Sequence, residues 1–81
     1  MKLFIGNLSE KVEDVHLKIA FQDFGKVVSA SVIKDKTTGL SKGYGFIEMP
    51  DDEEANKVIT TVNGGKWEGN IITVKKAFKQ A

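Results

Sequence analysis

The chain has 81 residues, of which 41% are hydrophobic and 28% charged, with a formal net charge of +1. This length suffices for one small domain but not for two, and the hydrophobic fraction is too high for a disordered polymer. Cysteine is absent and His16 is the only histidine, which excludes disulfides, thiolate metal sites and cysteine nucleophiles and leaves too few ligands for zinc.

The first half of the chain alternates between strand-like and helix-like patterns. Alternating side chains predict a first strand, with Leu3 and Ile5 on one face and Phe4 on the other. Apolar pairs three and four residues apart predict a helix over 14–24 that packs its phenylalanines into the core and stops at Gly25. The β-branched run 27–33 predicts a second strand.

A polar turn over 34–41 then leads to a predicted third strand over 44–49, which Pro50 ends. Four acidic residues open a second predicted helix over 51–62, where they suit the positive end of the helix dipole. Trp67 is expected to be a packing residue in a short connection, and a fourth strand follows over 71–74. The order β-α-β-β-α-β favours an α+β, ferredoxin-like fold, in which two helices cover one face of a four-stranded antiparallel sheet.

The other face of this sheet is open to solvent, and aromatic side chains point toward it. In the third strand the aliphatic set, Ile47 and Met49, belongs in the core, so Tyr44 and Phe46 lie outside beside Phe4. The inverted register is disfavoured because it buries charged side chains of the third strand. A cluster of rings on a solvent-facing sheet is typical of a binding site and suits unpaired bases.

Two motifs give the chain its family resemblance. Residues 42–49 read KGYGFIEM and match the octapeptide K/R-G-F/Y-G/A-F-V-x-F/Y in its first five positions, with Met49 departing at a core-facing position. Residues 3–8, LFIGNL, fit the companion hexapeptide on the first strand. The chain therefore resembles the RNA recognition motif family over 1–81 as a single domain, and most resembles small single-domain bacterial and cyanobacterial RNA-binding proteins.

The resemblance implies roles for individual residues. Phe4 and Tyr44 would stack on two neighbouring bases, Phe46 would pack against ribose, and Lys42 would meet a phosphate. The predicted strand faces add four further candidates for RNA contact, which are Lys2, Asn7, Thr73 and Lys75.

For several residues two interpretations stay open. Asn7 either caps the turn after the first strand or touches a base, and Phe78 either covers or extends the aromatic face or packs on the domain edge. Lys34 and Lys36 are equally compatible with phosphate contact and with plain solvation. His16 is expected to be exposed and without chemistry.

The prediction is a non-catalytic, cytoplasmic, monomeric module that binds single-stranded RNA without a metal or cofactor, with single-stranded DNA left open as a ligand. No membrane contact is expected. A second hypothesis is a protein-interaction domain that uses the same aromatic face. A third is a small enzyme on the same frame, similar to acylphosphatase, which is disfavoured because all twelve basic residues are lysines and that chemistry uses an arginine cradle for phosphate.

Overall fold

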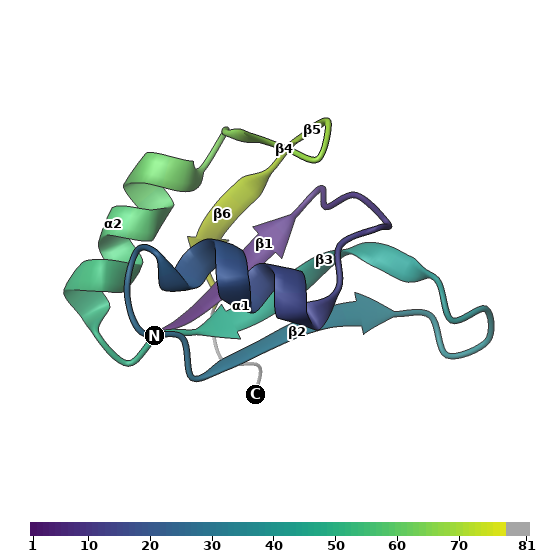
Figure 1. Ribbon diagram of the computed structural model, residues 1–81, viewed down its shortest axis with the longest axis horizontal. Coiled ribbons are helices and arrows are strands. Elements are labelled where there is room, and N and C mark those ends of the chain that lie inside the picture. Colours follow the sequence, from purple (N-terminus) through teal and green to yellow (C-terminus); the bar gives the residue numbers. More distant parts are fainter. Residues whose placement is uncertain (78–81) are drawn as a thin grey trace.

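The structure, a computed structural model, describes residues 1–77, so Phe78 lies outside the described residues. Four strands and two helices form the body of the domain (Figure 1), namely β1 (Lys2–Gly6), α1 (Asp14–Gln22), β2 (Ser29–Lys34), β3 (Ser41–Glu48), α2 (Asp52–Val62) and β6 (Thr73–Lys76). Two short strands, β4 (Lys66–Trp67) and β5 (Asn70–Ile71), precede β6.

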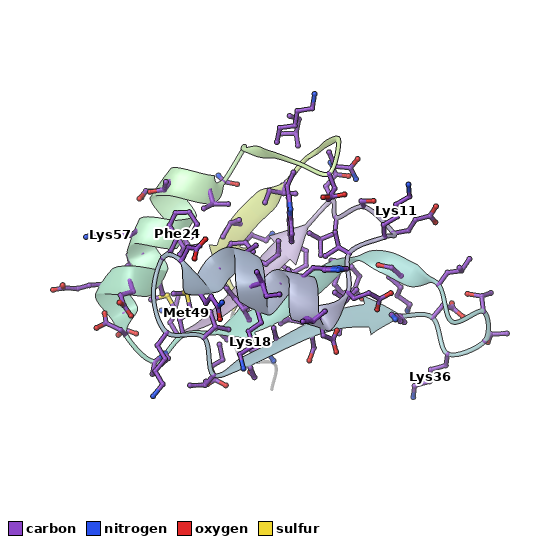
Figure 2. The ribbon with its side chains drawn as sticks, in the orientation of Figure 1. Lys11, Lys18, Phe24, Lys36, Met49 and Lys57 are labelled. Atoms are coloured by element: carbon purple, nitrogen blue, oxygen red, sulfur yellow. The ribbon has the colours of Figure 1, made fainter. Side chains whose placement is uncertain are left out.

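The four long strands form one antiparallel sheet in the order β2-β3-β1-β6. Both helices contribute to a single core with this sheet, because Leu17 and Phe21 of α1 and Val58 of α2 share a buried cluster with the strands. Met49, labelled in Figure 2, is fully buried in the same cluster. The predicted ferredoxin-like fold is confirmed, and the open face of the sheet lies opposite the helices.

Helix α1 differs from the prediction in its end and in its buried face. It ends at Gln22, and Phe24 lies beyond its end (Figure 2). Phe24 is 40% exposed and lines a cleft with Val62 and Trp67. Val15 and Ile19 are each 55% exposed. Both lie two positions from the buried Leu17, and two positions correspond to about 200° around the helix axis. The pair Val15 and Ile19, although apolar and four residues apart, therefore lies on the outer face of the helix.

Gly25 is not the helix stop that was predicted. A Cβ atom at this position would lie 2.6 Å from the carboxyl of Glu54 on α2. Glu54 also accepts a hydrogen bond from the backbone N–H of Lys26 at 3.3 Å. The missing side chain therefore lets the turn after α1 approach α2, a tertiary contact that local sequence signals do not reveal.

The connection around Trp67 is a second small sheet, which the sequence analysis missed. Lys66 pairs with Ile71 and Trp67 with Asn70 across a turn in which Glu68 has φ 51° and Gly69 φ 81°. Trp67 packs edge-on against Phe21, with ring centroids 6.1 Å apart, which confirms its expected packing role. Neither helix within residues 1–77 is long and apolar enough to cross a membrane.

Candidate nucleic-acid interface

Three aromatic rings meet on the open face of the sheet, on its two central strands. Phe4 on β1 pairs with Phe46 on β3, and Tyr44 pairs with Gly6 one row further along. The ring centroids of Phe4 and Tyr44 are 5.6 Å apart with an interplanar angle of 30°. Phe46 stands edge-on to both rings, at 5.7 Å from Phe4 and 6.1 Å from Tyr44. We call Phe4, Tyr44 and Phe46 the aromatic platform.

The core side of the same strands confirms the predicted register. Ile47 is 1% exposed, Leu3 and Ile5 are fully buried, and Gly45 is buried against Leu17 of α1. The rings are half-buried and rest on a sheet whose opposite face is packed. Flat rings held on rigid strands offer bases a surface that needs no reorganisation.

Two of the predicted lysines lie over the platform. The Lys2 ammonium is 4.8 Å from the centroid of Phe46, and the Lys75 ammonium is 5.2 Å from the centroid of Phe4. The cross-strand pairing of Lys75 with Phe4 places the two residues in one row of the sheet. Each ammonium is attracted to the negative face of its ring, so positive charge stands beside the stacking surface.

Lys42 lies on a bulge of β3, which weakens the alternation argument that assigned it to the open face. Val32 pairs with Gly45 and Lys34 with Ser41, so three β3 residues, 42–44, face one residue of β2. Gly43 takes φ 83° there, a left-handed conformation that favours glycine. Lys42 is exposed, and its phosphate contact stays a prediction.

Asn7 stabilises the turn after β1, which agrees with the first of its two interpretations. It has φ 60°, and its side-chain amide donates to the carbonyl oxygen of Ile71 at 2.7 Å. The Asn70 amide in turn donates to the carbonyl oxygen of Asn7 at 3.1 Å. Thr73 pairs with Gly6 and is exposed, in the same row of the sheet as Tyr44. The structure thus brings Thr73 beside the platform and ties Asn7 to β5.

Two serines beside the platform, Ser29 and Ser31, were not predicted from the sequence. Ser31 pairs with Phe46 and Ser29 with Glu48, and directly opposed residues of antiparallel strands share a face. Both serines are exposed. Their alternation with Ala30 and the buried Val32 is the signal that would have found them.

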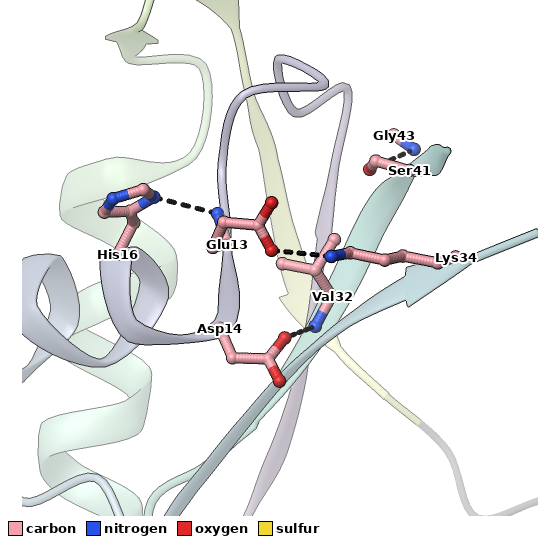
Figure 3. A network of polar contacts seen from close by, with 7 residues as sticks. All are labelled: Glu13, Asp14, His16, Val32, Lys34, Ser41 and Gly43. Atoms are coloured by element: carbon pink, nitrogen blue, oxygen red, sulfur yellow. Dashed lines mark hydrogen bonds and ion pairs between the residues drawn. The ribbon is translucent and has the colours of Figure 1, made fainter. Parts of the chain in front are cut away.

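A polar network joins the start of α1 to β2 (Figure 3). The Lys34 ammonium lies 2.6 Å from a carboxylate oxygen of Glu13. The hydrogen bond and the negative charge of Glu13 raise the pKa of Lys34 above its ordinary value. His16 is exposed, as expected, and its Nδ1 accepts the backbone N–H of Glu13 at 2.9 Å, which caps the start of the helix. The Lys34 ammonium group is therefore paired with a carboxylate of the protein itself.

The turn between β2 and β3 is organised by Asp35. Its carboxylate accepts the backbone N–H of Thr37 at 2.8 Å and of Thr38 at 3.1 Å. Since these bonds favour the charged form, they lower the pKa of Asp35 below its ordinary value, with the Thr38 bond as the largest cause. Lys36 follows on this turn and points outward (Figure 2).

The open face of the sheet combines several kinds of group that suit binding. Within residues 1–77 no three histidine, aspartate or glutamate side chains gather into a group that could hold a metal ion. The platform joins apolar ring faces, ammonium groups and hydroxyl groups on one side of a sheet. That combination matches the needs of stacked bases, phosphates and base edges.

Solved structures similar to this chain carry the same fold. The crystal structure of RNA binding protein PG1 superposes with a TM-score of 0.95 at 36% identity and covers 100% of this chain and 98% of that one. The second RRM domain of the yeast poly(U)-binding protein Pub1 gives a TM-score of 0.88 at 32% identity and covers 99% of this chain and 96% of that one.

Sequence relatives come from several kinds of organism. A chloroplastic 29 kDa ribonucleoprotein of Arabidopsis thaliana is 42% identical over 94% of this chain, which spans 22% of that relative. The mitochondrial glycine-rich RNA-binding protein 4 of the same plant is 40% identical over 99% of this chain, which spans 59% of it. The protein RbpD of Nostoc sp. is 35% identical over 95% of this chain and 82% of its own length. The sequence profile of the RNA recognition motif matches residues 3–73, and the chain belongs to the RNA recognition motif family.

Proposed function

We propose that this domain binds single-stranded RNA and catalyses no reaction. The observation that carries the proposal is the aromatic platform itself, three clustered rings on the open sheet face with the Lys2 and Lys75 ammonium groups over them. Base stacking on such rings tolerates many sequences, so we expect modest base preference over roughly 2–4 nucleotides. Two of the relatives are named as a ribonucleoprotein and as an RNA-binding protein, which supports the same proposal.

The ring geometry indicates which part of a nucleotide each ring of the platform would contact. Phe4 and Tyr44 lie at 30° to each other and suit two successive bases. Phe46 is edge-on to both and suits a ribose packed between them. Lys2, Lys75 and Lys42 serve as phosphate contacts in this proposal. Thr73, Ser31 and Ser29 supply hydroxyl groups at the platform margins, where base edges would lie.

Removing one ring at a time tests the platform. Phe4→Ala, Tyr44→Ala and Phe46→Ala are each expected to weaken binding of short single-stranded RNA by about 1–3 kcal/mol, because each removes a stacking partner. The measurement is fluorescence anisotropy with labelled RNA pools of randomised sequence. Thermal unfolding of the same variants should change little, since the rings lie outside the core.

A matched control comes from the helix side. Ile19→Ala likewise truncates an apolar side chain that lies outside the core, but on α1, where Ile19 is 55% exposed. Its RNA affinity should equal that of the unmodified domain. If Ile19→Ala weakens RNA binding and the platform variants do not, the ligand lies on the helices and the proposal is wrong.

The identity of the nucleic acid and the setting of the protein belong to the same proposal. Single-stranded DNA of matched sequence forms a second arm of the binding experiment, and tighter binding of RNA would show contacts to the 2′-hydroxyl. A monomeric state and a cytoplasmic location stay predictions. Relatives with this domain are named as chloroplastic and as mitochondrial proteins.

A further inference from the structure

Gly6 lies beneath the ring of Phe4, although both belong to the open face of the sheet. The two residues are two positions apart on β1, so their Cα–Cβ directions point to the same side. Gly6 is nonetheless buried. A Cβ atom at Gly6 would lie 2.7 Å from Cε1 and 3.1 Å from Cζ of Phe4. The ring of Phe4 therefore leans along the strand and fills the space where a side chain of residue 6 would stand.

This lean explains which rings come to lie nearly parallel. The residue directly across from Phe4 is Phe46, yet these rings meet at 66°. Tyr44 is across from Gly6, one row away, and its ring lies at 30° to Phe4 with centroids 5.6 Å apart. By leaning over Gly6, the Phe4 ring enters the row of Tyr44.

The backbone gives no competing reason for glycine at this position. Gly39, Gly43, Gly64 and Gly69 have positive φ, and Gly6 is not among them. The three atoms nearest to its hypothetical Cβ all belong to the ring of Phe4. Within a strand, glycine is less favourable than alanine for folding. Glycine here therefore works against strand stability and in favour of the ring position.

We infer that Gly6 is a positioning residue that sets the distance and angle between the two base-stacking rings Phe4 and Tyr44. The inference rests on the proposed function for its consequence in RNA binding, but the ring geometry itself does not require RNA. A methyl group at residue 6 would force the Phe4 ring back by about 1 Å to reach an ordinary carbon–carbon contact. The ring would retreat from the row of Tyr44.

The first experiment examines Gly6→Ala in the free protein by NMR. Nuclear Overhauser contacts between the ring protons of Phe4 and Tyr44 should weaken, and their ring-current shifts should move. The denaturation midpoint should be unchanged or higher, because alanine is the better strand residue. Gly25→Ala is the matched control, since its new methyl group also meets a side chain, Glu54 at 2.6 Å, but far from the platform. It should leave the ring signals unchanged.

The second experiment measures affinity for a fluorescein-labelled eight-nucleotide oligouridylate. Gly6→Ala should bind about five- to tenfold more weakly, the lower range for loss of one base stack. In a Phe4→Ala background the same substitution should change affinity less than about twofold, because the ring that it displaces is already absent. A purely structural glycine would reduce affinity equally in both backgrounds.

The two experiments separate the inference from the proposed function. Altered ring contacts together with no measurable binding of the oligouridylate or of the randomised RNA pools by the unmodified domain would overturn the proposed function and leave the ring positioning intact. Unchanged ring contacts in Gly6→Ala would overturn the inference. An equal loss of affinity in the two backgrounds would overturn it as well.

Discussion

Phe46 and Ile47 are neighbours in the chain whose side chains serve opposite faces of β3. Phe46 is half-buried on the aromatic platform, whereas Ile47 is 1% exposed in the core. The strand alternation that separates them also places Gly45 beneath α1, where a Cβ would lie 3.0 Å from Leu17. One register therefore fixes the position of the aromatic platform and the packing of the helix together.

This opposition predicts opposite effects of two adjacent substitutions. Ile47→Ala should lower the free energy of unfolding by about 2–5 kcal/mol, because it leaves a cavity in the core. Phe46→Ala should change stability much less and act mainly on RNA affinity. Chemical denaturation followed by the fluorescence of Trp67 measures the first effect. Equal destabilisation by both substitutions would contradict the assignment of faces.

The elements show which features the sequence could predict. Regular alternation and the octapeptide located the strands and the three rings, because those depend on local pattern and on a recognisable motif. The two-stranded sheet of β4 and β5, the contact of Gly25 with Glu54 and the bulge at Lys42 were missed. The contact of Gly25 with Glu54 joins segments that are distant in sequence, and the bulge breaks the periodicity of its strand. The strands β4 and β5 are each two residues long, which is too short for an alternating pattern to reveal them.

The junction of α1 with β2 gives a prediction at this scale. An Asp14 carboxylate oxygen accepts the backbone N–H of Val32 at 2.6 Å in a partly buried position (Figure 3). Asp14→Ala should lower the free energy of unfolding by about 1–3 kcal/mol, since it leaves that N–H without its partner. Asp23→Ala, at the exposed end of α1, is the control and should have little effect. Hydrogen exchange at Val32 should accelerate only in the first variant.

Across the whole molecule, a net charge of +1 conceals an uneven distribution of charges. Lys2 and Lys75 stand over the platform, whereas four acidic residues, 51–54, gather at the start of α2. Lys34 is paired with Glu13 and adds little free positive charge near the turn that follows β2. Glu48, exposed opposite Lys2 on the same face, offsets part of this charge. The open sheet therefore carries a small excess of positive charge, and a polyanion would contact few ammonium groups there.

The salt dependence of RNA binding should reflect this small number of lysines. With Lys2, Lys75 and Lys42 as the three phosphate contacts, the log–log slope of affinity against salt should be about −2, at about −0.7 per phosphate. Lys42→Gln should reduce the magnitude of the slope by somewhat under one unit and leave base preference unchanged, because phosphate contacts carry no sequence information. Lys57→Gln, on the outer side of α2 (Figure 2), is the matched control and should leave the slope unaltered. An affinity that does not depend on salt would favour the hypothesis of a protein-interaction domain. An unchanged slope in Lys42→Gln would show that Lys42, which lies on the bulge of β3, does not contact an RNA phosphate.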